Sequence, residues 1–231
     1  SGYDMLVIPP LYVATDQLLL AIDEFVQSGA MLAAVARTAY QTGLTGLEFA
    51  SGIPGTIGGA VVMNAGAYGG EMKNVLKEVT VLTKEVEVLV IPAKALELGY
   101  RTSVIPKNGW IVLGAVLQLK KGDQEQILAR MEELKEQRIT KQPLDLPSAG
   151  STFKRPEGYF AGKLIMDAGL RGFTVGGAQV SEKHCGFVVN RGNATAADVW
   201  ELICEVKRRV KEMTGVELEP EVKLLGDFPQ R

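Results

Sequence analysis

Residues 46–71 read GLEFASGIPGTIGGAVVMNAGAYGGE, and seven of the last twenty positions are glycine. Glycine loses more backbone entropy on folding than any other residue, so such a cluster indicates either tight turns or a surface that lies against a ligand. Neither common phosphate fingerprint is present, because no G-x-G-x-x-G follows a strand and no G-x-x-x-x-G-K-[ST] occurs. The pattern alone slightly favours turns. In the ligand interpretation, backbone N–H groups would face an anion at Gly52, Gly55, Gly58 and Gly59.

Apolar residues at helical spacing predict three helices, over residues 30–40, 123–138 and 195–215. The second begins at Asp123 with a glutamine three residues later, which is a capping-box pattern. The third begins at a threonine and ends at Gly215, where a left-handed cap is expected.

Strand-like alternation occurs at 78–91, in two stretches, and again at 110–120 and 186–190. Helices and strands are mixed rather than strictly alternated, so the sequence predicts an α+β fold rather than a doubly wound parallel sheet. The segment 141–158 contains three prolines. It is either a domain linker or a functional loop, and both interpretations stay open.

The overall composition excludes several classes of protein. Lys plus Arg number 25 against 27 for Asp plus Glu, so a general nucleic-acid binder is not expected. Cys185 and Cys204 have no paired spacing, which argues against a disulfide framework or a metal site and favours a reducing compartment. No apolar run is long enough to cross a bilayer, and the start of the chain lacks a signal-peptide pattern. We therefore expect a cytoplasmic protein without a membrane span.

Four separated blocks together carry a resemblance to a known family. They are residues 46–71, GYRTS at 99–103, QPLDLPSAGSTFKRP at 142–156 and LEPEV at 218–222. In this order they resemble the UDP-N-acetylenolpyruvoylglucosamine reductase (MurB) family of bacterial cell-wall enzymes. The resemblance implies an α+β fold with an FAD-binding region at 1–119, incomplete at its front, and a C-terminal substrate-binding domain at 120–231.

The resemblance also implies a cofactor and a reaction. Bound FAD, reduced by NADPH, would serve the reduction of the enolpyruvyl ether of UDP-N-acetylglucosamine to UDP-N-acetylmuramate in peptidoglycan synthesis. A flat ring system and a diphosphate need close approach to bare peptide groups, which side chains would prevent. The expected cofactor-binding residues are Ser51, Gly52, Ile53, Pro54, Gly55, Thr56, Ile57, Gly58 and Gly59, and Asn64, Ala65 and Gly66 belong to the same block.

Three catalytic residues follow from the same resemblance, namely Arg101, Ser151 and Glu221. Arg101 would approach the substrate carboxylate, for which its fork of donors is suited. Ser151 would donate a proton to C2 of the substrate. Taken alone, the arginine would be a surface charge and the serine a turn residue. Glu219 is the rival of Glu221, because alternation in a strand would send both carboxylates to one face.

The expected substrate-binding residues are Tyr100, Lys154 and Lys163, and Arg155 is a further possible diphosphate partner. Each basic residue could instead be a solvated surface charge. His184 is the single histidine of the chain, and no G-x-S-x-G accompanies it. We expect His184 to pack near the site without acting as a base.

The chain departs from the family pattern in two places. Only residues 157–160 separate KRP from AGKLI, as in the shorter, second type of the family. Residues 2–22 resemble the start of the flavin subdomain, a strand followed by a helix, but a GxGSNLL-like element is absent. Either a stretch near residues 22–24 is missing from the sequence or the deletion is real, which would put flavin affinity in doubt. The alternatives to the reductase are a non-catalytic nucleotide-sugar binding remnant and a flavin oxidase for another substrate.

Overall fold

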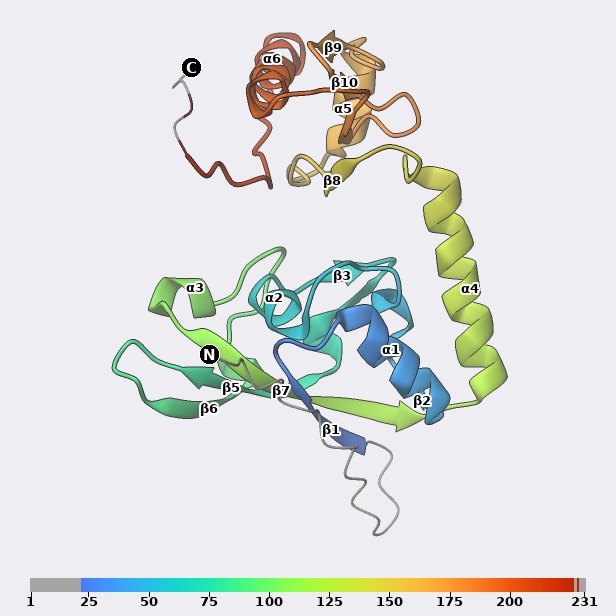
Figure 1. Cartoon of the computed structure of the whole chain (residues 1–231), viewed down its shortest axis with the longest axis vertical. Helices are drawn as coiled ribbons and strands as arrows, with labels where there is room; N and C mark the ends of the chain where they lie inside the picture. The colour runs from blue at the N-terminus through green and yellow to red at the C-terminus, as the bar shows by residue number, and fades with distance from the viewer. Residues whose placement is uncertain (1–21, 227, 229–231) are drawn as a thin grey trace, which may run out of the picture. The chain divides into compact units, whose positions relative to one another are not determined.

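The computed structural model describes residues 22–226 and residue 228. The chain divides into two compact units, of which the first ends at Glu136 and the second begins at Gln137 (Figure 1). Both units combine helices with antiparallel sheet, so the predicted α+β class is confirmed. The boundary expected between residues 119 and 120 stays a prediction. The resemblance noted for residues 2–22 lies outside the described residues, apart from Ile22.

A five-stranded antiparallel sheet forms the base of the first unit. Its strands follow the spatial order β1-β7-β5-β6, with β2 paired to the end of β7. The long strand β7 lies between β1 and β5 and holds the sheet together. The strands are β1 (Ile22–Gln27), β2 (Leu44–Thr45), β5 (Leu76–Leu82), β6 (Val88–Pro92) and β7 (Ile111–Lys121).

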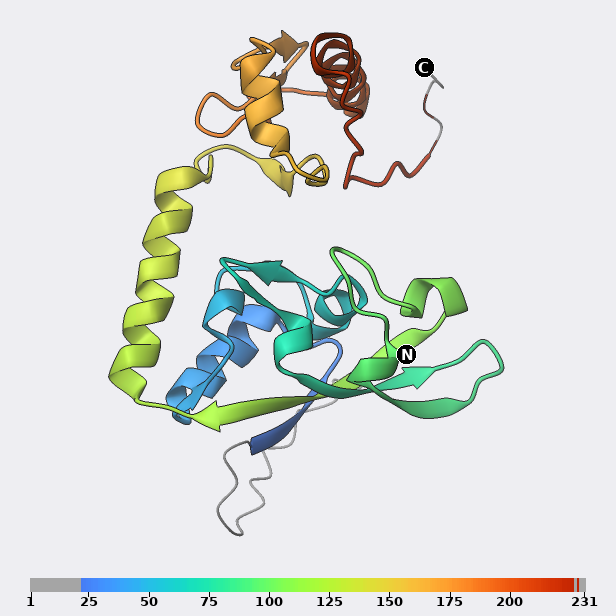
Figure 2. The ribbon, with the colours of Figure 1, turned by 180° about the vertical axis from the view of Figure 1, so that it is seen from behind.

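Helices cover one face of this sheet. The helices α1 (Leu32–Gln41) and α2 (Ile57–Val62) lie on the same side of it in both views (Figure 1, Figure 2). Their apolar residues join the inward side chains of the strands in one core, in which Leu32, Ile57 and Leu117 are completely buried. This core fixes the position of the glycine-rich stretch, because α2 is part of that stretch.

Short elements complete the first unit. A hairpin of two-residue strands, β3 and β4, follows α2. Three single turns of 3-10 helix and the short helix α3 connect the remaining strands. Their bounds are η1 (Glu48–Ala50), β3 (Gly66–Ala67), β4 (Gly70–Glu71), η2 (Met72–Asn74), η3 (Ala93–Ala95) and α3 (Ile105–Asn108).

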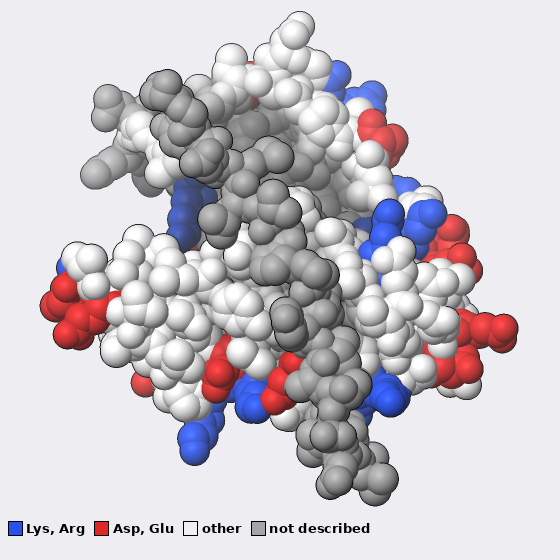
Figure 3. Space-filling model, turned by 60° about the horizontal axis from the view of Figure 1, so that its bottom comes forward, with Lys and Arg blue, Asp and Glu red and all other residues white. Residues whose placement is uncertain are grey.

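The opposite face of the sheet carries exposed apolar side chains. Phe25, Val88, Val90 and Ile111 are each more than half exposed, between 57% and 61%. This side of the sheet comes forward in Figure 3, where uncharged atoms dominate its described part. Among the described residues, this face therefore combines exposed apolar side chains with charged ones, such as the Asp23–Lys77 ion pair.

The second unit packs two helices against a four-stranded antiparallel sheet of order β8-β11-β10-β9. Its core contains Ile165 from α5 together with Ile203 and Val206 from α6. The elements are β8 (Ser148–Ser151), α5 (Ala161–Asp167), β9 (Thr174–Val175), β10 (Ala178–Val180), β11 (Phe187–Asn190) and α6 (Ala196–Thr214).

Capping chemistry explains why the two long helices were predictable. In α6, Thr195 and Asp198 form a reciprocal capping box, and Gly215 ends the helix at a φ of 73°. The helix α4 (Gln124–Lys141) starts after Asp123, whose carboxylate accepts a hydrogen bond from the Gln126 N–H at 2.9 Å. No helix in the described part of the chain is long and apolar enough to cross a membrane.

The buried face of β7 is predicted to carry the stability of the first unit. Leu117 is fully buried and Leu113, on the same strand, is 39% exposed. Replacing Leu117 by alanine should lower the free energy of unfolding by about 2 to 5 kcal/mol, because it leaves a cavity. The measurement is urea unfolding followed by Trp110 fluorescence in a Trp200→Phe background, since the second unit holds the other tryptophan.

Leu113→Ala is the matched control and should lose much less unfolding free energy. Equal losses for the two variants would contradict the assignment of an inner and an outer face of the sheet.

Candidate active site

The glycine-rich stretch is held against the segment that leads into α1. The Leu32 N–H donates to the Gly55 carbonyl at 2.9 Å, and the Ile57 N–H donates to the Ala30 carbonyl at 2.9 Å. At the start of the stretch, the Ser51 hydroxyl donates to the Glu48 carbonyl at 2.9 Å. The path of residues 51–57 is therefore fixed by the fold before any ligand binds.

Glycine is needed at different positions of this stretch for different physical reasons. Gly55 has a φ of 117°, which side chains rarely adopt. A Cβ on Gly58 would lie 3.0 Å from the Ser28 Cβ, so close packing requires this glycine. Gly59 has neither reason: it is exposed, and a Cβ there would meet only the Thr56 hydroxyl at 3.9 Å. The fold therefore explains why glycine occupies positions 55 and 58, but it does not explain the glycine at position 59.

Part of the stretch expected to be a loop is helical. Ile57, Gly58 and Gly59 form the first turn of α2, because Thr56 acts as its N-cap. The Gly58 N–H donates to the Ser28 carbonyl at 2.9 Å, so this donor is engaged within the fold. A run of N–H groups facing an anion therefore does not include Gly58.

Arg101 lies beside the second half of the glycine-rich block. Gly99 and Thr102 exchange backbone hydrogen bonds at 3.1 and 3.4 Å, which closes a tight turn around it. Arg101 sits in this turn at a φ of 53°, which is uncommon for a residue with a side chain. Both terminal nitrogens of its guanidinium lie 3.5 Å from the Gly66 carbonyl oxygen. The neighbouring Tyr100 ring is 56% exposed, and its centroid lies 5.4 Å from the Arg101 Cζ.

Asn64 positions this arginine loop, a role that the sequence did not reveal. The side chain is 1% exposed, and its amide donates to the Gly99 carbonyl at 3.0 Å and to the Glu71 carboxylate at 2.6 Å. Its amide oxygen accepts from the Lys73 N–H at 2.9 Å. Asn64 thus joins the glycine-rich block to the turn that holds Arg101. The one available signal was an asparagine between an apolar run and a glycine, which is typical of a left-handed residue.

In the second unit, the segments that carry Ser151 and Glu221 lie side by side. The Glu221 N–H donates to the Thr152 carbonyl at 2.8 Å, and the Lys154 N–H donates to the Glu219 carbonyl at 2.8 Å. On its other side, the Thr152 N–H donates to Gly186 at 2.8 Å. Ser151 is exposed at the end of β8 and Glu221 is half-buried. The fold therefore brings two of the predicted catalytic residues to neighbouring segments of the chain.

The two glutamates of LEPEV have different surroundings. Glu219 is exposed, and its carboxylate forms an ion pair with Lys154. Glu221 is half-buried, and its N–H donates to the carbonyl of Thr152, the residue after Ser151. Glu219 is thus held in an ion pair with Lys154, and Glu221 stays the predicted catalytic residue.

Both predicted substrate lysines lie in the second unit, and each has a carboxylate partner. Lys154 pairs with Glu219, as described above. Lys163 on α5 pairs with Asp167 at 2.9 Å, one helical turn away, and its side chain is 65% exposed. A surface pair of this kind contributes little to stability, so a ligand phosphate could compete for either ammonium group.

His184 packs beneath the serine segment. Its Nδ1 accepts a hydrogen bond from the Gly186 N–H at 3.0 Å, and its ring lies edge-on to Phe187. Burial lowers the pKa of His184 below its ordinary value of 6.5. The imidazole is therefore neutral near pH 7 and supports the backbone that pairs with Thr152.

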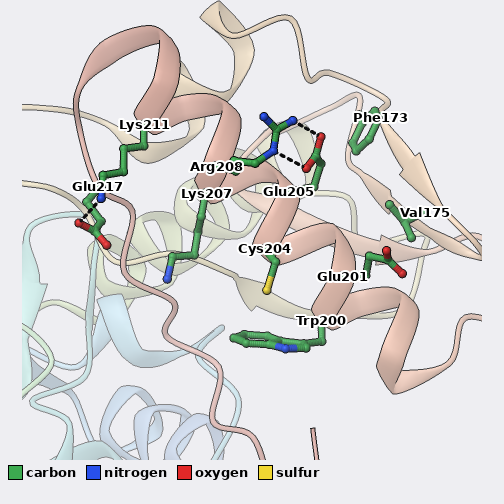
Figure 4. Close-up of a pocket in the computed structure, with 10 residues that line it drawn as sticks. All are labelled: Phe173, Val175, Trp200, Glu201, Cys204, Glu205, Lys207, Arg208, Lys211 and Glu217. Carbon is green, nitrogen blue, oxygen red and sulfur yellow. Dashed lines mark hydrogen bonds and ion pairs between the residues drawn. The ribbon is translucent and has the colours of Figure 1, made fainter. Parts of the chain in front are cut away.

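A cavity of about 580 Å³ lies elsewhere in the second unit, along α6 (Figure 4). Charged groups around it pair with one another: Glu205 accepts hydrogen bonds from Arg208 and Arg209, which lower its pKa to about 2. None of the predicted site residues lines it, so we do not assign catalysis there. Its lining residues are Phe173, Val175, Trp200, Glu201, Cys204, Glu205, Lys207, Arg208, Lys211 and Glu217.

The predicted residues therefore fall into two groups. The first unit brings Tyr100 and Arg101 to the glycine-rich block, and the second brings Ser151, Lys154 and Glu221 to two adjacent segments. Within residues 22–226 and 228, no cluster of three or more His, Cys, Asp or Glu side chains could hold a metal ion.

Comparison with known proteins adds two family models. Residues 25–91 match a model described as an FAD binding domain. Residues 142–225 match the model of the C-terminal domain of UDP-N-acetylenolpyruvoylglucosamine reductase.

Relatives that carry the same enzyme name are similar over most of this chain. The protein from Agathobacter rectalis is 61% identical over 87% of this chain and 64% of its own length. The protein from Caldanaerobacter subterraneus subsp. tengcongensis is 55% identical over 87% of this chain and 67% of its own. The crystal structure of MurB from Thermus caldophilus is 42% identical, with a TM-score of 0.75 over 85% of this chain and 71% of that one. This chain thus spans about two thirds of the length of these relatives.

The neutral His184 predicts a pH dependence of stability. Because its pKa in the folded state lies below 6.5, the unfolded state takes up the proton first as the pH falls. Stability contributed by the neutral ring is therefore present above pH 6.5 and is lost below it. The second unit should lose unfolding free energy between about pH 7 and about pH 5, and His184→Gln should reduce that loss.

Urea unfolding followed by Trp200 fluorescence in a Trp110→Phe background measures this dependence. Since the chain has one histidine, no other imidazole contributes. Identical pH profiles for the two proteins would refute the role assigned to His184.

Proposed function

The chain belongs to the UDP-N-acetylenolpyruvoylglucosamine reductase family, and we propose that it reduces the enolpyruvyl ether of UDP-N-acetylglucosamine to UDP-N-acetylmuramate. The cofactor is FAD, the reductant is NADPH, and the reaction belongs to peptidoglycan precursor synthesis in the cytoplasm. One observation carries the proposal: two hydrogen bonds of 2.8 Å pair residues 152–154 with residues 219–221, beside Ser151 and Glu221.

The glycine-rich block fits a flavin. At Gly55 an added Cβ would meet nothing within 4 Å, and at Gly59 it would meet a single atom at 3.9 Å. Both positions are exposed, so their bare backbone is open to a planar ligand. The match of residues 25–91 to an FAD binding domain supports the same assignment. The proposed cofactor-binding residues are those from Ser51 to Gly59.

When bound, the flavin supplies hydride transfer between the nicotinamide and the substrate carbon. Arg101 binds the substrate carboxylate, because a guanidinium offers two parallel donors and keeps its charge at any physiological pH. Negative charge grows on that carboxylate as the carbon–carbon double bond is reduced. A fixed positive charge there stabilises the transition state, and removing such a partner costs about 3 kcal/mol of barrier.

Ser151 donates the proton to C2 of the substrate. Its hydroxyl stands at an exposed strand end, so the resulting alkoxide can recover a proton from solvent. Glu221, half-buried on the neighbouring segment, holds a position from which it can orient the serine or polarise the substrate acid.

Lys154 and Lys163 bind the diphosphate in this proposal, with Tyr100 as a further substrate contact. Each lysine would exchange its carboxylate partner, Glu219 or Asp167, for phosphate oxygens. We keep residues 1–119 as the FAD-binding region and residues 120–231 as the substrate-binding domain.

Gly59→Ala tests the cofactor surface. The substitution should preserve or raise stability, because alanine is favoured over glycine in a helix by about 1 kcal/mol and the added methyl meets no close neighbour. The same methyl should reduce FAD affinity at least about tenfold, or about 1.4 kcal/mol. The measurements are flavin absorbance per protein and the Kd of FAD.

Gly58→Ala is the counterpart and should lose stability, since its Cβ would press on Ser28. A wild-type protein that binds no FAD would defeat the proposal. If that protein still bound a UDP-sugar, it would be the nucleotide-sugar binding remnant.

Ser151→Ala tests the proton donor. Reduction of the bound flavin by NADPH should proceed as in the wild type, because it does not use the serine. Reduction of the enolpyruvyl substrate should slow by about two to four powers of ten. Stopped-flow absorbance follows both half-reactions separately.

Ser148→Ala, on the same strand, is the matched control and should keep both rates. Substrate turnover by Ser151→Ala at the wild-type rate would refute the role of Ser151 as the proton donor. A wild-type protein that NADPH reduces but that does not reduce the enolpyruvyl substrate would favour a flavin enzyme for another substrate.

A further inference from the structure

Two aromatic side chains stand in water directly before α5. Tyr159 is 50% exposed and Phe160 is 61% exposed. Apolar surface that stays in water contributes no burial free energy, so the core does not explain these rings. Exposed aromatic residues on a loop are typical of a recognition surface, because a ring offers a large rigid contact area.

The Phe160 ring is ordered by its own loop. The guanidinium carbon of Arg155 lies 4.0 Å from the ring centroid, within the range of a cation–π contact. The Arg155 Nε donates to the Tyr159 carbonyl at 3.3 Å, and the Tyr159 N–H donates to the Pro156 carbonyl at 3.1 Å. A cation therefore covers one face of the ring, and the exposed remainder of the ring is available to a ligand.

This loop packs next to the serine segment. A Cβ on Gly162, two residues after Phe160, would lie 3.1 Å from the Gly186 nitrogen. The Gly186 carbonyl accepts the Thr152 N–H at 2.8 Å, and Thr152 follows Ser151 directly. The start of α5 and the serine strand thus share Gly186 as a common neighbour.

Flat apolar surface and positive charge together match the chemistry of a nucleotide. We infer that Phe160 stacks the nucleobase of the nucleotide-sugar substrate, with Arg155 beside its phosphates and Tyr159 at the edge. The identity of the base as uracil rests on the proposed function. Stacking on an aromatic ring is worth about 1 to 3 kcal/mol per base, or roughly 5- to 150-fold in affinity.

Phe160→Ala tests the inference, with UDP as the probe and the full chain as the protein. Isothermal titration calorimetry should give a Kd for UDP about 5- to 150-fold weaker than in the wild type. Phe160→Trp should restore binding, since a larger ring stacks at least as well. Met213→Ala is the matched control, because Met213 lies in the same unit and is also 61% exposed. It should change the Kd by less than about twofold.

A second variant separates the loss of the ring from a folding defect. Phe160→Leu keeps most of the apolar volume but removes the ring, so it should fold and still lose affinity for UDP. In steady-state kinetics, Phe160→Ala should raise KM for the UDP-sugar and leave kcat nearly unchanged, as expected for a contact made equally before and during the reaction.

The outcomes separate this inference from the proposed function. The stacking of the base on Phe160 would be refuted by a Phe160→Leu protein that binds UDP as tightly as the wild type. A wild type that does not bind UDP would refute it as well. If UDP binding depends on Phe160 in a protein that neither holds FAD nor turns over substrate, base stacking on Phe160 is supported and the proposed reductase activity is refuted.

Discussion

The short pairing between residues 152–154 and 219–221 is the constraint on which the candidate site of the second unit depends. Its two hydrogen bonds join segments that lie more than sixty residues apart in the sequence. Two consecutive residues at this pairing have different roles. The Thr152 side chain is buried and its hydroxyl accepts a hydrogen bond from the Val188 N–H, whereas Ser151 is exposed. The segment is therefore anchored by Thr152 and presents the preceding residue, Ser151, to solvent.

In the first unit, the turn that holds Arg101 is positioned by a buried side chain. Its glycine-rich block turns into α2 under close contact with Ser28, and buried Asn64 then ties the block to the turn of Arg101. Both units thus position a predicted site residue through bonds to backbone groups rather than through surface ion pairs. Backbone hydrogen bonds shielded from water hold geometry better than exposed charge pairs do.

Sequence patterns identified the long elements, because α4, α6 and β7 carry clear periodicity and the two helices carry capping residues as well. They did not reveal that the glycine-rich stretch contains α2, since glycine has a low helix propensity and this helix depends on its Thr56 cap and on packing against Ser28 and the core. The helix α5 was missed for a similar reason, as seven residues give little periodicity. Single motifs indicated Arg101, Ser151 and Glu221 only through their resemblance to a family, whereas the positioning role of Asn64 depends on contacts across the fold.

The places where local rules are broken coincide with the proposed chemistry. Arg101 adopts a left-handed conformation, Gly59 weakens a helix without a packing reason, and Phe160 leaves its ring in water. Each feature makes the isolated fold less stable than an obvious alternative residue would. In each unit, such features are better explained by a ligand than by packing. Bound flavin would cover Gly59, a substrate carboxylate would use Arg101, and a nucleobase would cover Phe160, so each unfavourable choice has a ligand group that would compensate for it.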